Sequence, residues 1–138
     1  MARIPYRIKE FCVHKDIPVE VADKILIHHI SPMIEVSEAM KSWVVVYKGG
    51  GYVPRGCVCL DGCCGLSGHD FDKYGAVDYT CSPDHFETML FYIIELTRYS
   101  RIGVDRRNLF VHCDYSITDK RIVMEKKGEE WITVKEIK

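Results

Sequence analysis

The sequence predicts one α+β domain, with helices at its N-terminal end and a small, mainly antiparallel sheet after them. Residues at helical spacing dominate up to about residue 41, and segments rich in β-branched and aromatic residues dominate from residue 43 onward. One long helix is expected between two of these strands. Helices followed by strands, instead of a regular strand–helix alternation, favour the α+β class.

Two helices are expected first. Pro18 suits a first helical position, and the residues that follow at helical spacing are Val19, Ala22, Ile25, Leu26 and His29. Ser31-Pro32 has the signature of a new N-cap and first helical residue, so a second helix is expected from there to about Lys41.

Strands and one more helix follow. Trp43–Tyr47 is rich in β-branched and aromatic residues and is expected to be a buried strand, which Gly49–Gly51 ends. Tyr52–Gly68 is expected to be a long irregular loop, a kind of segment that is often functional, and Ala76–Thr80 a second strand.

The second half continues this pattern. Ser82-Pro83-Asp84 repeats the helix-start signature, and the helix is expected to run to about Arg98. Leu109–Asp114 is expected to be a third strand. Arg121–Glu125 and Glu130–Val134 are expected to form a hairpin around Lys127-Gly128.

Composition indicates an ordinary globular domain spanning residues 1–138. The chain is 47% hydrophobic and 28% charged with a net charge of −1, so it offers no basis for an electrostatic clamp on nucleic acid. Met1–Glu10 carries charges where a secretory signal would be apolar, and no apolar run approaches the ~20 residues of a membrane span. We therefore expect a protein made soluble in the cytoplasm, without a membrane partner.

The chain contains seven cysteines, and this odd number without an export signal argues against a disulfide framework. Four of them, Cys57, Cys59, Cys63 and Cys64, fall in the glycine-rich stretch. Reduced thiols, a structural zinc site and a disulfide formed after release from a cell are the three interpretations of this cluster.

Three polar residues interrupt apolar strands. His112 and Asp114 share a strand face because side chains alternate, and Asp78 lies between Val77 and Tyr79. A buried carboxylate or imidazole requires a partner or a metal. With His69, two imidazoles and one carboxylate make a three-ligand zinc site that leaves a position for water. Each residue also has an ordinary explanation: a satisfied core histidine, a backbone-bonded aspartate and an exposed histidine.

The segment Ser67–Asp78, SGHDFDKYGAVD, resembles the S-x-H-x-x-G-x-A-x-D motif of D-Ala-D-Ala carboxypeptidase-like zinc peptidases. This family includes murein endopeptidases, phage endolysins and vancomycin-resistance dipeptidases, and the hedgehog signalling domain is a structural cousin. Ile102–Asp105 with Phe110–Asp114 is similar to the family's GVG…FVHVD segment, and Gly51-Tyr52 is similar to its SGYR turn. The resemblance covers Trp43–Asp114 and implies a hedgehog/D-Ala-D-Ala peptidase-like fold.

The resemblance implies that His69, Asp78 and His112 bind one zinc ion. Val53 stands at the family's substrate-binding arginine, so Arg55 is the nearest candidate to hold a substrate carboxylate with its planar fork. His69 and Asp78 are two residues further apart than in the motif, and Tyr74 replaces its glycine. Gly75 is the position expected to absorb this insertion.

Leu109 stands where several relatives have a glutamate three residues before the last histidine. Asp114 is therefore the expected general base, with orientation of an imidazole as its alternative role. Asp105 and Asp72 are further candidates for the base.

The implied activity is zinc-dependent hydrolysis of peptidoglycan peptide bonds, of D,D- or L,D-type, by a carboxypeptidase or an endopeptidase. The implied substrates are short wall peptides that contain D-amino acids, and a single domain without an export signal resembles a phage lysis enzyme. Two alternatives stay open: a catalytically impaired zinc-binding relative that acts as a binding or structural module, and a cysteine-rich loop that is itself the functional element.

Overall fold

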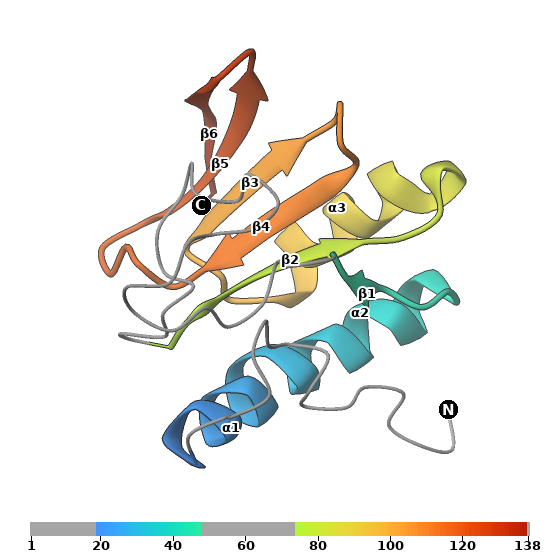
Figure 1. Ribbon diagram of the computed structural model, residues 1–138, viewed down its shortest axis with the longest axis vertical. Helices are drawn as coiled ribbons and strands as arrows, with labels where there is room; N and C mark the ends of the chain where they lie inside the picture. The colour runs from blue at the N-terminus through green and yellow to red at the C-terminus, as the bar shows by residue number, and fades with distance from the viewer. Residues whose placement is uncertain (1–18, 48–73, 138) are drawn as a thin grey trace.

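The computed structural model describes residues 19–47 and 74–137 and shows a mixed α+β fold (Figure 1). The described elements are, in chain order, α1 (Val19–Ile25), η2 (Leu26–Ile30), α2 (Ser31–Met40), β1 (Val45–Val46), β2 (Ala76–Thr80), η4 (Pro83–His85), α3 (Phe86–Leu96), β3 (Arg101–Asp105), β4 (Phe110–Asp114), β5 (Arg121–Lys127) and β6 (Glu130–Ile137). Among these residues, no helix is long and apolar enough to cross a membrane.

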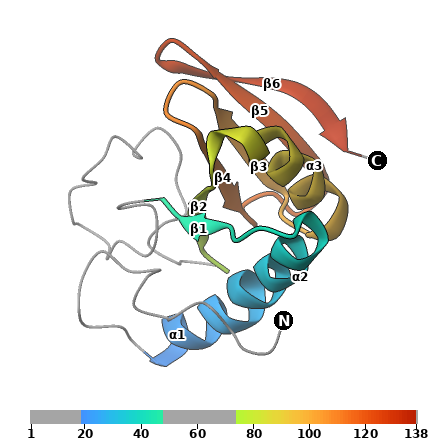
Figure 2. The same cartoon turned by 90° about the vertical axis from the view of Figure 1, so that its right-hand side faces the viewer.

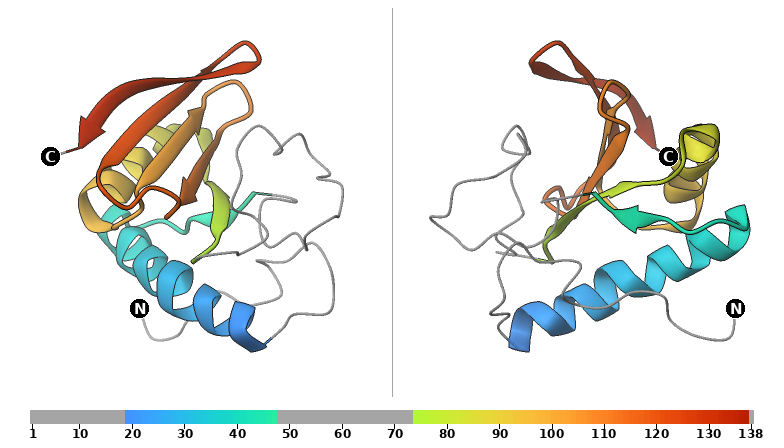
Figure 3. Two further views of the ribbon diagram at one scale, coloured as in Figure 1. Left: turned by 90° about the vertical axis from the view of Figure 1, so that its left-hand side faces the viewer. Right: turned by 45° about the vertical axis from the view of Figure 1, so that its right-hand side comes forward.

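The described strands form one six-stranded sheet in the order β1-β2-β4-β3-β5-β6. Neighbouring strands pair antiparallel except β3 and β5, which pair parallel. The expected α+β class and the mainly antiparallel sheet are therefore confirmed. The α3 helix connects β2 to β3 and packs beside α2 (Figure 2). The β5–β6 hairpin forms the edge of the sheet opposite β1 (Figure 3).

The α2 helix begins at Ser31 as predicted, but it continues the preceding π turn without a break, so the predicted N-cap at Ser31 is wrong. Ser31 itself has helical angles, φ −58° and ψ −50°, and its N–H bonds to the carbonyl of Leu26 five residues earlier. Pro32 lacks an N–H, and in a regular α-helix its ring would clash with the carbonyl of His28. The wider π turn relieves that clash. Tyr115 Oη donates to the His28 carbonyl at 2.6 Å and replaces the missing backbone donor.

The expected buried strand Trp43–Tyr47 is shorter and more exposed than predicted. Only β1 pairs, at the edge of the sheet, and Trp43 and Val45 are 38% and 48% exposed. Val44 is buried, and its N–H donates to Ser37 Oγ at 3.2 Å. An edge strand is covered on fewer sides than a central one, so its residue types alone do not report its burial.

The predicted strand and helix around residue 80 are confirmed in their main parts. The β2 strand has the predicted bounds, and the helix begins after Ser82 with one 3₁₀ turn before α3. It ends at Leu96 and not at Arg98, because Thr97 is extended, with φ −113° and ψ 169°. The N–H and Oγ1 of Thr97 both donate to the Ile93 carbonyl and close the last turn.

The third predicted strand begins one residue late, because Leu109 has φ 57° and belongs to the turn. No strand was predicted over Arg101–Asp105, where β3 lies between β4 and β5. The predicted C-terminal hairpin is confirmed, with longer strands than expected. Gly128 at its turn has φ 63°, a left-handed conformation that favours glycine.

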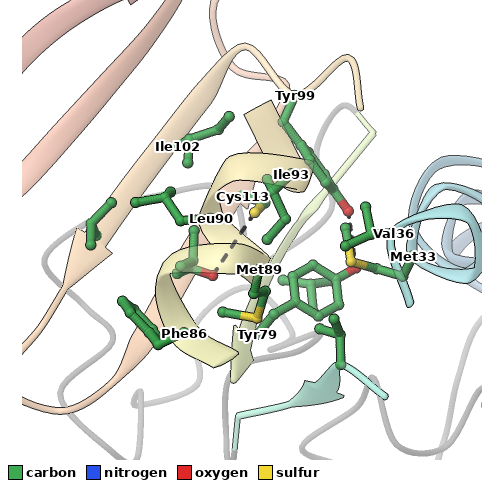
Figure 4. Close-up of a cluster of buried hydrophobic side chains, with 14 of the residues drawn as sticks. Met33, Val36, Tyr79, Phe86, Met89, Leu90, Ile93, Tyr99, Ile102 and Cys113 are labelled. Atoms are coloured by element: carbon green, nitrogen blue, oxygen red, sulfur yellow. Dashed lines mark hydrogen bonds between the residues drawn. The ribbon is translucent and has the colours of Figure 1, made fainter. Parts of the chain in front are cut away.

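The hydrophobic core lies between α2, α3 and the face of the sheet that they cover. Its sheet residues alternate with the polar residues of the same strands, as expected for period-two side chains. Figure 4 shows much of this cluster, which includes Met33, Val36, Val77, Tyr79, Met89, Ile93, Ile102, Val104, Val111 and Cys113.

A buried series of hydrogen bonds fixes Tyr74, which lies two residues before β2. His29 is fully buried, and its Nε2 lies 2.8 Å from the carbonyl oxygen of Tyr74. A carbonyl only accepts, so Nε2 carries the proton and Nδ1 accepts from Tyr99 Oη at 2.8 Å. Tyr99 in turn bonds to Tyr79 Oη at 2.9 Å. The helical run thereby holds the chain at the entrance to β2.

Candidate functional site

Asp78 and His112 are direct partners in neighbouring strands. The antiparallel register of β2 and β4 places Asp78 opposite His112. Their strand neighbours Val77 and Val111 point into the core beneath the helices, so Asp78 and His112 point to the opposite face. Two residues that lie 34 positions apart in the sequence are thereby brought into contact.

Two buried carboxylates hold the imidazole of His112. Its Nδ1–H donates to Asp78 Oδ1 at 2.8 Å, and its Nε2–H donates to Asp114 Oδ2 at 2.7 Å. All three side chains are at most 2% exposed. Both ring nitrogens are therefore saturated, and the plane of the ring is fixed from two sides.

The carboxylate of Asp114 has further donors on both oxygens. Arg101 donates to Oδ2 from Nε at 2.8 Å and from Nη2 at 2.7 Å. The backbone N–H and the hydroxyl of Ser116 donate to Oδ1 at 3.0 and 2.7 Å. The carboxylate is thus held on both edges, with Arg101 directly opposite Asp114 in the register of β3 and β4.

The buried contacts shift the pKa values of His112 and Asp114 in opposite directions. Burial alone lowers the pKa of His112, but its hydrogen bonds to Asp114 and Asp78 and the charges of these carboxylates raise it to about 9. Burial alone raises the pKa of Asp114, but the hydrogen bond and charge of His112, with the Ser116 N–H and Arg101, lower it to about 2. At neutral pH, the ionised carboxylate of Asp114 therefore faces the imidazolium of His112.

Several predicted site residues lie outside the described residues: His69, Arg55, Asp72 and the cysteine cluster 57–64. Asp105 is described, and both of its oxygens accept from Asn108, from the backbone N–H at 2.9 Å and from the side-chain amide at 3.0 Å. This pattern is that of a turn-capping aspartate. Gly75, the position expected to absorb the longer spacing, has φ 89°, which a residue with a Cβ rarely adopts.

Asp78 and His112, two of the three residues expected to bind zinc, carry donor atoms of the kinds that zinc takes. Two ligand atoms on tetrahedral zinc lie roughly 3.3 Å apart, since each bond is about 2.0–2.1 Å. Nδ1 of His112 and Oδ1 of Asp78 are 2.8 Å apart, so the two atoms would have to separate slightly to bind one ion together. Within residues 19–47 and 74–137, no group of three or more histidine, cysteine, aspartate or glutamate side chains is arranged to hold a metal. The third expected ligand, His69, lies outside the described residues.

Sequence reasoning missed Arg101 and Ser116. Arg101 follows no motif, and it can be paired with Asp114 only once β3 is known to lie beside β4. Ser116 carries a local signal, because a serine two residues after an aspartate is well placed to bond to its carboxylate.

Comparison with known proteins found no match among protein-family models, curated proteins or solved structures.

Proposed function

We propose that this chain is a zinc-dependent peptidase that hydrolyses peptide bonds of peptidoglycan, as a D,D- or L,D-type carboxypeptidase or endopeptidase. Asp78 and His112, with His69 from the sequence motif, would hold one zinc ion. The substrates would be short wall peptides that contain D-amino acids. Arg55 would bind a carboxylate of that peptide.

The contact between Asp78 and His112, completed by Asp114, carries this proposal. A histidine that binds a metal almost always donates its second ring N–H to a carboxylate, a carbonyl or water, which fixes its tautomer. The Nε2–H bond to Asp114 meets this requirement and leaves Nδ1 directed at Asp78. Burial of an ionised group costs several kcal/mol. Two buried carboxylates around one histidine therefore favour a role for these residues beyond packing.

The chemistry would be divided among few groups. Zinc at such a site polarises a carbonyl and lowers the pKa of a water molecule to about 7. Asp78 and His112 supply ligand atoms, and Asp114 keeps the imidazole of His112 in the orientation that presents Nδ1. The contacts of Asp114 on both oxygens favour this orienting role over that of general base.

Asp114→Asn separates these two roles. If Asp114 is the base, the variant keeps its zinc affinity and loses turnover. If Asp114 orients His112, the dissociation constant for zinc should rise by about 10- to 100-fold, as is usual for groups that hold metal ligands. Zinc titration by calorimetry and hydrolysis by the zinc-saturated variant measure the two quantities independently.

The activity test uses purified peptidoglycan of several wall chemotypes. Zinc-loaded protein should release new amine ends, and a chelator should stop the release. Asp78→Asn should abolish the release of amine ends. Asp84 is an exposed carboxylate in the turn before α3, so Asp84→Asn should leave the release unchanged. No release from any chemotype by fully loaded protein would refute the peptidase proposal.

A second candidate is a zinc-binding relative without catalysis, which would use the site for stability or partner binding. One observation favours it: Leu109, at the place of the glutamate of several relatives, lies in a turn with φ 57° and offers no carboxylate. Stoichiometric zinc binding and zinc-dependent thermal stability, without hydrolysis of any wall peptide, would select this candidate.

A further inference from the structure

The structure assigns Arg101 a positioning role: its guanidinium fixes the Asp114 carboxylate, which in turn fixes the imidazole of His112 for metal binding. The inference about zinc rests on the proposed function, whereas the inference about the orientation of His112 holds for the metal-free protein as well.

The first support is the arrangement of three strands. In the register of β3 and β4, Arg101 lies opposite Asp114 and Gly103 lies opposite His112. Arg101 and Asp114 are therefore cross-strand neighbours on the face that carries His112. Asp114 accepts from both Arg101 and His112, so it links the guanidinium to the imidazole.

The second support is the geometry of the contact. Nε and Nη2 of Arg101 both donate to Oδ2, the oxygen that also accepts Nε2–H of His112. Ser116 donates twice to the other oxygen, Oδ1. Donors on both edges prevent rotation of the carboxylate, and rotation would withdraw Oδ2 from His112. A planar guanidinium can give two donors in fixed directions to one carboxylate, which a lysine ammonium cannot.

The third support is burial. The Arg101 side chain is 17% exposed and that of Asp114 is 1% exposed, so little water is present to replace either partner. A buried carboxylate that loses its donors retains the full penalty of desolvation. Loss of the Arg101 fork should therefore move Asp114, and with it the acceptor for His112.

Arg101→Lys is the decisive variant because it keeps the positive charge and removes the planar fork. Arg121→Lys is the matched control. Arg121 is also partly buried, and it donates from Nε to the Tyr99 carbonyl at 2.8 Å and from Nη2 to the Ile94 carbonyl at 3.3 Å, away from Asp114. Both variants should unfold at lower temperature than the natural chain.

The first readout is the ring N–H signal of His112 in ¹⁵N-histidine NMR of metal-free protein, identified by its loss in His112→Gln. We expect this slowly exchanging Nε2–H signal to shift or disappear in Arg101→Lys and to stay in place in Arg121→Lys. Ser116→Ala, which removes one donor to Oδ1, should give a smaller shift in the same signal.

The second readout is the dissociation constant for zinc, measured by competition with a chelator. It should rise about 10- to 100-fold in Arg101→Lys and change less than twofold in Arg121→Lys. An unchanged His112 signal in a folded Arg101→Lys protein would overturn the inference, and so would an equal change in both variants. If the natural chain binds no zinc, the proposed function fails, and the NMR comparison still decides the role of Arg101.

Discussion

Raising the pH of the metal-free protein should deprotonate His112, which lies between Asp78 and Asp114, and thereby destabilise the fold. The folded pKa of His112 is raised to about 9, above the ordinary value of 6.5 expected in the unfolded chain. The stabilisation is therefore fully present below pH 6.5 and is lost as the pH rises through 9. The direction is opposite to that of a histidine buried in its neutral form.

The size of the effect follows from the two pKa values. The difference between about 9 in the folded chain and 6.5 in the unfolded chain corresponds to about 3 kcal/mol of unfolding free energy. Because the His112 side chain is 2% exposed, solvent screens little of this contribution. For a chain of this size, such a change lowers the melting temperature by roughly 10 °C.

Urea unfolding at several pH values, in a chelator and a thiol reductant, measures this loss. Other groups titrate in the same range, so the informative quantity is the difference between the natural chain and His112→Gln. His85→Gln, at an exposed histidine, is the control and should behave like the natural chain. An NMR titration of the His112 ring supplies a check that does not depend on the variants. A midpoint at or below 6.5 would refute the ion-paired arrangement.

Three further substitutions test contacts elsewhere in the fold. Tyr115→Phe removes the donor to the His28 carbonyl in the π turn, so chemical unfolding should show a loss of about 1–3 kcal/mol; no loss would contradict this account of the turn. Met89→Ala, in the core, should cost about 2–5 kcal/mol in the same assay, and a smaller cost would indicate a looser core. Arg106→Ala breaks the ion pairs of a 44% exposed arginine with Glu87 and Glu125 and should cost less than about 1 kcal/mol, an effect that added salt should reduce further.

The sequence was most informative where a segment's own residues determine its structure. The β2 strand is marked by β-branched and aromatic residues, and the helix start at Ser82 by an N-cap pattern. The hairpin turn is marked by Gly128, which has a positive φ in the structure. The same holds for Asp78 and His112, whose polarity within apolar strands predicts that each has a partner.

The remainder depends on contacts between distant residues. The helix continues through Pro32 because Tyr115, far along the chain, bonds to the carbonyl of His28 that the proline cannot engage. Trp43 and Val45 are exposed because β1 forms an edge, which their β-propensity does not reveal. Arg101 could not be assigned to the site before the sheet order placed β3 beside β4.

The central claim is that Asp78 and His112 share one zinc ion with His69. Crystals grown with zinc, with diffraction recorded on both sides of its absorption edge, test this claim most directly. We expect one anomalous peak per chain within bonding distance of Nδ1 of His112 and a carboxylate oxygen of Asp78, with Nε2 still bonded to Asp114. An intact hydrogen bond between Asp78 and His112 in zinc-saturated crystals, with zinc elsewhere or absent, would contradict it.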